Sequence, residues 1–288
     1  MTDPTRPARP GILAVLNASP DSFSGSTVDA DGAADAAAAL VAQGADVIDI
    51  GAQSLRTDQA EIPVATEIDR LLPVLSAVRD RLPDTTISVD TYRHEVAAAA
   101  LGIGVQIVND PSGLRDPDMA AVVADAGVEL VLTYNIATPK VRLDRSQLAA
   151  DPVADCETYL AARIDLLVAR GVPTDRIVLD LGADLGKSPD QTIEVLRATP
   201  QVRGRLGVRR VLWALSRKDF VGALVEEPPR GRGPGTLGAM AALDIHDEDL
   251  LRVHDVVATA QFFTVQRAVS RGVDGPLELR PDLRHNPV

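Results

Sequence analysis

Polar residues that could do chemistry stand at the ends of short apolar runs along this chain. Asp90 and Asp180 lie within or at the last step of two such runs, where a lone charge is costly unless it is paired or faces a cavity. Asn109 ends a third run, and Lys218 follows another. Carboxylates accept paired N–H donors, an Asn amide both donates and accepts, and a Lys ammonium donates to a carbonyl or a ring nitrogen. Together these residue types suit a flat heterocycle with an amidine-like edge.

A second polar group combines basic side chains with an amide. Arg252 and His254 are two residues apart in the last apolar run, so a strand would place both side chains on one face. Arg56 follows the second run, and Asn17 ends the first. Because Arg binds phosphate oxygens as a planar fork, this group predicts an anion subsite, such as one for a diphosphate with Mg²⁺. The alternative for His254 is a purely structural hydrogen bond, and the nearby Arg252 favours ligand contact.

The elements that would position these residues follow a regular alternation. Eight short runs rich in Val, Ile and Leu alternate with longer segments of helical spacing, and continuous apolar runs are typical of strands buried on both faces. Asp29 or Asp31 is placed to cap the first helix, and Asp190 the sixth. The apolar runs are 11–17, 46–51, 86–91, 106–110, 129–135, 177–182, 210–216 and 250–256.

The spacing of these runs predicts the fold. From Asn17 to His254 the run ends recur about every 34 residues, which is the size of one βα unit. Eight such units predict a single (β/α)8 TIM barrel over residues 11–272, in which the carboxyl ends of the strands meet at one rim. A doubly wound open sheet is the alternative, although the first run lacks a Gly-x-Gly-x-x-Gly motif. We expect residues 1–10 to be a disordered arm and residues 273–288 a C-terminal tail.

Composition narrows the functional classes. The 288 residues carry 29 Lys and Arg against 41 Asp and Glu, a formal net charge of −12 that disfavours binding to nucleic acid backbones. The single cysteine, Cys156, excludes an internal disulfide and a zinc site of several thiolates. No apolar stretch approaches the roughly 20 residues of a membrane span, and no signal peptide is visible. We therefore expect a cytoplasmic protein with neither nucleic acid nor membrane as partner.

One connection is long for a loop between a strand and a helix. Residues 218–236 follow the seventh run and are rich in Gly and Pro. A solvated connector and a mobile lid are both compatible with this composition, and a helix start is expected near Pro234–Thr236.

At these residues the chain resembles the dihydropteroate synthase family, over about residues 11–270. The resemblance implies that 6-hydroxymethyl-7,8-dihydropterin diphosphate is condensed with para-aminobenzoate, with release of diphosphate, in folate biosynthesis. The motifs, in an order and at a spacing specific for pterin-binding barrels, are Asn17-Ala-Ser-Pro-Asp-Ser-Phe23, Ser88-Val-Asp-Thr91, Ile107-Val-Asn-Asp110, Ser216-Arg-Lys218 and Arg252-Val-His-Asp255.

The resemblance implies a role for each polar residue. The carboxylates Asp90 and Asp180 would stabilise cationic character on the pterin as the diphosphate leaves, and no enzyme nucleophile is needed. The family usually forms dimers through its last helices, so a homodimer using the stripe Val257, Phe262 and Val265 is expected. By position, the pterin would be held by Asp90, Asn109, Asp180 and Lys218, of which Asp90, Asp180 and Lys218 would be catalytic. The diphosphate would be held by Arg56, Arg252 and His254, and by Asn17 through Mg²⁺. The aminobenzoate side would be lined by Ser216 and the stem of Lys218.

The loops on the aminobenzoate side depart from the family. The usual Gly-Gly-Glu-Ser-Thr-Arg-Pro-Gly reads Gly51-Ala-Gln-Ser-Leu-Arg-Thr-Asp58, and a Met-His segment is replaced by Thr133-Tyr-Asn135. The usual Asp-Pro-Gly-Phe-Gly-Phe-Gly-Lys reads Asp180-Leu-Gly-Ala-Asp-Leu-Gly-Lys187, so Leu185 replaces a phenylalanine expected against the aminobenzoate ring. Ala214 stands where a Gly usually precedes Ser-Arg-Lys.

Three functions follow from this mixture. The pterin and diphosphate residues favour a working synthase. The altered loops favour a pterin-binding paralogue with another amine substrate or little synthase activity, like the divergent second synthase copy of actinobacteria, which residues 214–222 resemble. A methyltetrahydrofolate-dependent methyltransferase of the same superfamily needs no diphosphate site, so Arg56, Arg252 and His254 count against it.

Overall fold

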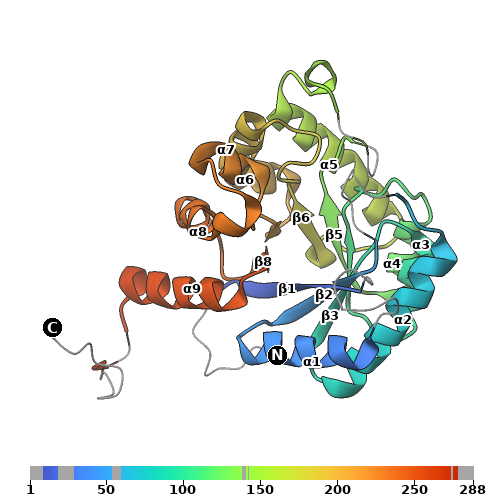
Figure 1. Ribbon diagram of the computed structural model, residues 1–288. Coiled ribbons are helices and arrows are strands. Elements are labelled where there is room, and N and C mark those ends of the chain that lie inside the picture. The colour runs from blue at the N-terminus through green and yellow to red at the C-terminus, as the bar shows by residue number, and fades with distance from the viewer. Residues whose placement is uncertain are drawn as a thin grey trace.

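The computed structural model of the chain describes residues 9–18, 29–53, 60–137, 141, 143–273 and 275–277. Within those residues, the strands form a closed parallel barrel in which each strand pairs with the next and β8 pairs with β1. Figure 1 shows the helices arranged around these strands. The predicted (β/α)8 TIM barrel is confirmed, and the open-sheet alternative is wrong because the pairing of β8 with β1 closes the sheet.

The elements follow the predicted alternation, and the strands end up to three residues before the apolar runs do. The strands are β1 (Gly11–Asn17), β2 (Val47–Gly51), β3 (Thr86–Asp90), β4 (Ile107–Asp110), β5 (Glu129–Thr133), β6 (Ile177–Asp180), β7 (Arg210–Trp213) and β8 (Leu250–Val253). The helices are α1 (Ala30–Ala42), α2 (Val64–Arg81), α3 (His94–Leu101), α4 (Met119–Ala126), α5 (Pro152–Ala169), α6 (Pro189–Leu206), α7 (Asp219–Val225), α8 (Gly233–Ala242) and α9 (Val256–Arg271).

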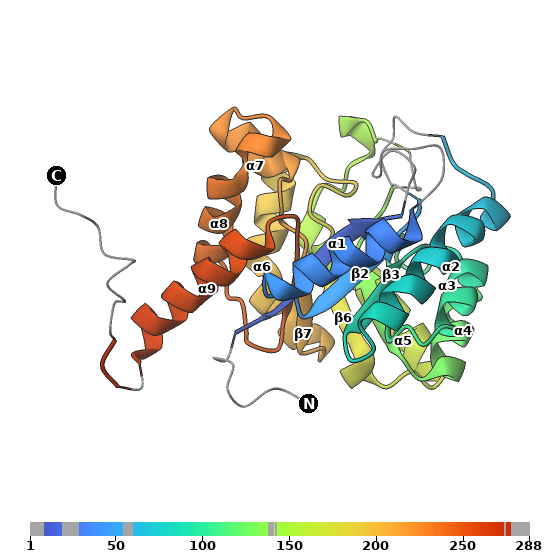
Figure 2. The same cartoon turned by 60° about the horizontal axis from the view of Figure 1, so that its bottom comes forward.

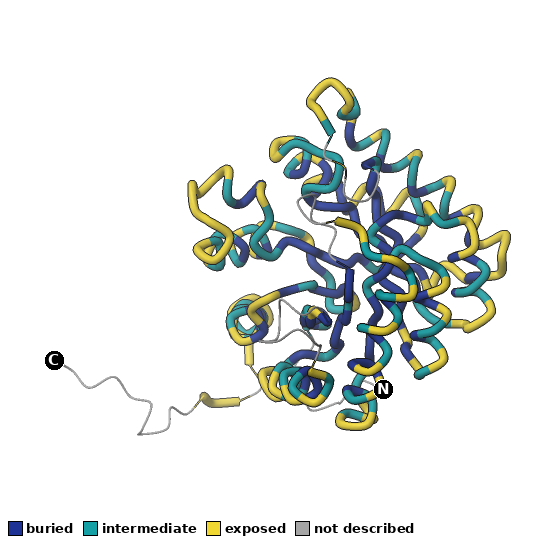
Figure 3. Tube along the Cα trace, turned by 45° about the vertical axis from the view of Figure 1, so that its right-hand side comes forward, coloured by how far each residue is buried: buried dark blue, intermediate teal, exposed yellow. Residues whose placement is uncertain are grey.

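Both faces of the strands are buried, which explains why the runs are continuously apolar. Figure 3 shows the buried strands at the centre and exposed residues on the outer sides of the helices. Side chains of alternate strand residues fill the barrel, and an apolar cluster inside it includes Val47, Ile107, Val178 and Leu250. The residues two positions further along, on the same inward face, are Asp49, Asn109, Asp180 and Arg252. The barrel interior is thus apolar below and polar at the carboxyl ends of the strands.

The connection from 218 to 236 is structured. It holds α7 and a short 3-10 turn, Pro229–Gly231, and α8 begins at Gly233, so the helix start expected near Pro234 is confirmed. The guanidinium of Arg232 donates to the carbonyls of Arg217 and Lys218 and to the Asp219 carboxylate. Residues 223–231 of this connection are exposed to solvent, so the solvated-connector and lid interpretations both stay predictions.

The described part of the chain holds no helix with the length and apolar character needed to cross a membrane. Strands and helices occupy Gly11 to Arg271. Most of the predicted arm, 1–10, and tail, 273–288, lies outside the described residues, so the division at those boundaries stays a prediction.

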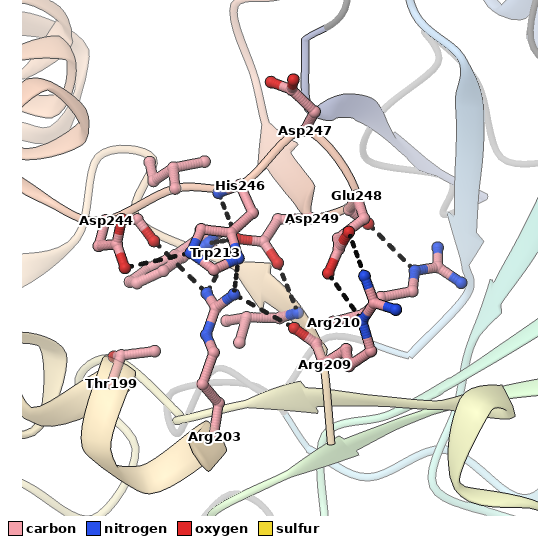
Figure 4. A network of polar contacts seen from close by, with 12 residues as sticks. Thr199, Arg203, Arg209, Arg210, Trp213, Asp244, His246, Asp247, Glu248 and Asp249 are labelled. Carbon is pink, nitrogen blue, oxygen red and sulfur yellow. Dashed lines mark hydrogen bonds and ion pairs between the residues drawn. The ribbon is translucent and has the colours of Figure 1, made fainter. Parts of the chain in front are cut away.

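At the amino-terminal ends of β7 and β8, one buried carboxylate joins three elements (Figure 4). The Oδ2 atom of Asp249 accepts hydrogen bonds from Arg203 Nη2 at 3.0 Å, Trp213 Nε1 at 2.8 Å and the His246 backbone N–H at 2.9 Å. Its Oδ1 accepts from the Val211 N–H at 2.9 Å. Since Asp249 is fully buried, this network ties α6 to β7 and β8 on the face opposite the polar strand ends.

The variant Asp249→Asn keeps the shape of this side chain and removes the charge that faces Arg203. We expect it to lower the free energy of unfolding by about 3–5 kcal/mol, because it leaves a buried guanidinium without its counter-charge. Chemical denaturation measures the change. The matched control Glu248→Gln, whose partner Arg209 is exposed, should have little effect, and equal losses in the two variants would contradict the prediction.

Candidate active site

The polar layer at the mouth of the barrel is organised around Arg252 of β8. Its Nε donates to Asp49 Oδ2 at 2.7 Å, and its Nη2 donates to Asp90 Oδ2 at 2.6 Å. The amide of Asn109 donates to the same Asp49 oxygen at 3.2 Å. These contacts fix side chains from β2, β3, β4 and β8 against one another. Asp90, Asn109 and Arg252, each predicted from the sequence, are therefore brought together.

Asp49 is a site residue that the sequence analysis missed. It is fully buried and bridges Arg252 and Asn109. Its signal was a lone carboxylate in the middle of the apolar run 46–51, where burial is costly without a cationic partner. Because two nitrogens of Arg252 bind carboxylates, its predicted contact with a ligand anion stays a prediction.

The two predicted catalytic carboxylates have raised pKa values. Burial raises the pKa of Asp90 to about 7; Arg252 opposes the rise, while Asp49 adds to it. Burial also raises the pKa of Asp180, against the Gly182 N–H and the ammonium groups of Lys218 and Lys187, which lower it. Near neutral pH, Asp90 can therefore either accept N–H donors as a carboxylate or hold a proton.

Lys218 reaches from the end of β7 to the loop that follows β6. Its Nζ donates to the Ala183 carbonyl at 2.9 Å, close in sequence to Asp180, whose Oδ1 accepts from the Gly182 N–H at 2.8 Å. The half-buried Leu185 lies in the same loop. Asp180, Lys218 and Leu185 are thus brought to one side of the mouth.

Lys187 supports this loop from behind. Its Nζ donates to the Leu185 carbonyl at 2.9 Å and lies 4.0 Å from the centre of the Tyr134 ring. Burial lowers the pKa of Lys187 to about 8. The phenol of Tyr134 in turn donates to Asp155 of α5 at 2.6 Å, so Tyr134, which departs from the family motif, is part of the loop's support.

His254 and Ser216 form a pair at the ends of β8 and β7. The His254 Nδ1 and Ser216 Oγ atoms are 2.9 Å apart, and the His254 backbone N–H donates to the same Oγ at 3.3 Å. Loss of hydration, together with Arg217, Arg252 and Lys218, lowers the pKa of His254 to about 4. His254 is therefore neutral near pH 7 and offers a hydrogen bond to an anion, but no charge.

The segment between Ser216 and Lys218 has an unusual backbone. Arg217 has a φ of 61°, in the left-handed region that non-glycine residues seldom adopt. Such strain is of order 1–3 kcal/mol and persists only where the surroundings enforce it, often at functional sites. Here it sits between two predicted substrate-binding residues.

The remaining predicted residues belong to the loops after β1 and β2. Asn17 is exposed at the end of β1, where it pairs in register with Gly51 of β2. Arg56 lies outside the described residues, as do the altered positions Leu55 and Thr57.

Among the described residues, His94, Asp116 and Asp118 have potential metal-ligand atoms within 4.8 Å of one another. The Asp116 oxygens accept hydrogen bonds from the backbone N–H groups of His94 and Asp118, and its Oδ2 lies 2.8 Å from the His94 ring nitrogen. These contacts account for the cluster as a cap at the start of α3, a different place from the predicted ligand Asn17.

Comparison with known proteins agrees with this geometry. A family model described as pterin binding enzyme matches residues 13–254. A dihydropteroate synthase of Synechocystis sp. is 34% identical over 264 residues, with 90% of each chain covered. A crystallised dihydropteroate synthase of Xanthomonas albilineans with 4-aminobenzoic acid has a TM-score of 0.81 and 33% identity, covering 91% of this chain and 94% of its own. A mitochondrial folate synthesis bifunctional protein of Arabidopsis thaliana is 34% identical over 274 residues, and the chain spans 50% of its length.

The balance of charges around Asp90 is testable by titration. In the variant Arg252→Gln, the pKa of Asp90 should rise above about 7, because the cation that favours the carboxylate is gone. Carbon-13 NMR of the aspartate carboxyl measures it. Since folding raises this pKa, the stability contributed by protonated Asp90 is full at low pH and is lost as the pH rises through about 7. The control Arg210→Gln, which removes the partner of Glu129 at the amino-terminal ends of the strands, should leave the titration unchanged; a lower midpoint in Arg252→Gln would contradict the assignment.

Proposed function

The chain belongs to the dihydropteroate synthase family of pterin-binding enzymes and is a transferase of that type, and on this premise we propose that it joins 6-hydroxymethyl-7,8-dihydropterin diphosphate to para-aminobenzoate. The products are dihydropteroate and diphosphate. The observation that supports this most directly is the mouth of the barrel, where Asp49, Asp90, Asn109 and Arg252 are hydrogen-bonded to one another.

The pterin is held by Asp90, Asn109, Asp180 and Lys218. Carboxylates accept the ring N–H groups, the amide donates and accepts, and the Lys218 ammonium donates to an oxygen or ring nitrogen. The bond between the methylene carbon and the diphosphate breaks as positive charge develops on the pterin, and the carboxylates of Asp90 and Asp180 stabilise that charge. The amine of the second substrate then attacks the methylene and loses a proton.

The leaving diphosphate is assigned to Arg252 and the neutral imidazole of His254, which lie at the mouth beside Asp90 and Ser216, and to Arg56, which is outside the described residues. Asn17 offers one exposed amide oxygen at this edge, which fits Mg²⁺, an ion that prefers oxygen ligands and takes most of them from water and substrate phosphates. When bound, Mg²⁺ neutralises charge on the diphosphate. The Nε and Nη2 atoms of Arg252 donate to Asp49 and Asp90, so the remaining N–H groups of its guanidinium are the ones that would orient the diphosphate.

The aminobenzoate side is lined by Ser216, the stem of Lys218 and Leu185. A second candidate function is a pterin-binding paralogue that uses another amine or has little synthase activity. It is favoured by Leu185, which gives no aromatic surface for stacking, and by Ala214, whose methyl group is buried in the apolar cluster inside the barrel. Membership of the actinobacterial branch and a cytoplasmic location stay predictions.

Release of diphosphate from the dihydropterin diphosphate, with Mg²⁺ and para-aminobenzoate, distinguishes these functions. The wild-type protein should turn over, and Asp90→Asn should lose about 100-fold or more in kcat, because the charge that stabilises the cationic pterin is gone. The control Asp165→Asn, on an exposed part of α5, should keep full activity.

Wild-type protein that binds a pterin tightly by calorimetry but shows no turnover would favour the paralogue and direct the search to other amines. Absence of both turnover and pterin binding would overturn the proposed function.

We also propose that two copies associate through α9. Val257, Val265 and Val269 of α9 are 41%, 61% and 83% exposed, and Val265 and Val269 border a groove between α8 and α9 together with Phe262 and Leu237. Figure 2 shows the C-terminal half of α9 extending beyond the barrel. A two-fold axis would place the same apolar face of a second copy against this one, which removes both from water.

The variant Val265→Asp places a charge on this face. We expect it to convert a wild-type dimer into a monomer in sedimentation velocity, since burying an unpaired carboxylate at the interface is costly. Val168→Asp, the same change at an exposed position of α5, should leave the dimer intact. A monomeric wild-type protein would contradict the proposal.

A further inference from the structure

The loop between β6 and α6 contains a strained residue at a place where the family loop has glycine. Asp184 has a φ of 62°, in the left-handed region that is disfavoured for a residue with a side chain. In the family pattern Asp-Pro-Gly-Phe-Gly-Phe-Gly-Lys, the corresponding residue is Gly, which adopts this conformation without strain. An aspartate held here indicates that its side chain makes contacts that offset the strain.

Those contacts are with the start of α7. The Asp184 carboxylate accepts hydrogen bonds from the backbone N–H groups of Asp219 and Phe220, the latter at 3.2 Å. The Asp184 N–H also donates to Thr192 Oγ1 of α6 at 3.2 Å. One residue of the β6–α6 loop is therefore bonded both to α6 and to the first residues of α7.

Asp184 does for α7 what the helix's own N-cap residue usually does. The first N–H groups of a helix lack partners within the helix, and the N-cap side chain commonly accepts from them. The N-cap residue of α7 is Lys218, whose side chain makes no such bond. Its Nζ instead donates to the Ala183 carbonyl at 2.9 Å, next to Asp184. Because a Lys ammonium has no acceptor, Lys218 cannot cap these N–H groups itself, and Asp184 of the neighbouring loop supplies the cap instead.

The same short segment is held from its other side. Arg232 donates to the Arg217 carbonyl at 2.9 Å and to the Lys218 carbonyl at 3.1 Å, so the carbonyls before α7 and its first N–H groups are both fixed. Arg217, like Asp184, has a left-handed backbone. The backbone of Lys218 is thus set by contacts on both sides of a strained turn.

We propose that Asp184 is a positioning residue that sets Lys218 for the pterin by capping α7 from the neighbouring loop, an inference that rests on the proposed function. In this role Asp184 acts through Lys218 and not on the substrate itself. Its carboxylate determines where α7 begins, and the start of α7 determines where the Lys218 ammonium lies.

Four variants isolate this role. Asp184→Gly removes the cap and relieves the backbone strain, so the fold is retained. Asp184→Asn tolerates the left-handed backbone and keeps one oxygen acceptor, so it should restore most of the function. Asp219→Pro removes one capped N–H, and its Cδ, which replaces that hydrogen, displaces the Asp184 carboxylate from the helix start. Proline is accepted at the first position of a helix, and the extended backbone of Lys218 suits a residue before proline. Asp219→Ala is its matched control, because it loses the same side chain and keeps the N–H.

The first measurement does not depend on the function. Limited acetylation followed by mass spectrometry reports the reactivity of Lys218 relative to Lys140. We expect Lys218 to be acetylated several-fold faster in Asp184→Gly and Asp219→Pro than in wild type, and at about the wild-type rate in Asp184→Asn and Asp219→Ala. Equal labelling of Lys218 in all five proteins would overturn the proposal.

The second measurement is a double-mutant cycle on the Kd for a pterin, by calorimetry. Asp184→Gly should weaken binding about tenfold in the wild-type background, because a small misplacement of a binding group is costly. In the Lys218→Met background, the Asp184→Gly substitution should change the Kd for the pterin by less than about twofold. A full tenfold effect in both backgrounds would show that Asp184 does not act through Lys218. A wild-type protein that binds no pterin would overturn the proposed function instead, and the acetylation result would then decide the positioning role alone.

Discussion

The ion pair between Arg252 and Asp49 is the interaction on which the mouth of the barrel depends. A fully buried carboxylate is tolerated only with a counter-charge and further hydrogen bonds, and Asp49 has both, from Arg252 and Asn109. Burial disfavours the charge on Arg252, but Asp49 and Asp90 outweigh it and raise the pKa of Arg252. The guanidinium therefore stays charged across the whole working pH range, and the pKa of Asp90, its other partner, is raised to about 7 by burial.

This arrangement is possible because the two ends of the barrel have separate tasks. The apolar cluster inside the barrel fills the space below the mouth, so the polar layer lies at the carboxyl ends of the strands. At the opposite end, both carboxylate oxygens of the fully buried Asp249 accept hydrogen bonds, from Arg203, Trp213 and the backbone of β7, which makes that network a structural one. The charged network at the amino-terminal ends of the strands therefore stabilises the fold, and the charged side chains at the carboxyl ends form the candidate active site.

The fold was predictable because its signals are local. Each strand, buried on both faces, is a continuous apolar run, and on β2, β4, β6 and β8 the inward residue two positions beyond the apolar cluster is polar or charged. The partners of those residues were not predictable: Arg252 and Asp49 are far apart in the sequence, and the period of a strand gives the face of a side chain but not what it meets. Asp190 was a wrong choice of helix cap, because the Ser188 hydroxyl, in a capping box with Gln191, takes that place. No pattern of residue types reveals the left-handed backbone of Asp184.

The left-handed backbone of Asp184 connects the departures from the family pattern on the aminobenzoate side. A glycine at 184 and a phenylalanine at 185 would give a loop free to adjust and an aromatic face to stack on. This chain has instead an aspartate bonded to α7 and α6, followed by Leu185, whose carbonyl is held by Lys187. A flexible loop loses conformational entropy when the substrate binds, whereas this loop loses it when the protein folds. On the proposed function, the chain thus lacks an aromatic ring that would stack on the second substrate, but its pocket surface is ordered before that substrate binds. The amine is then selected by how it fits an apolar surface beside Lys218.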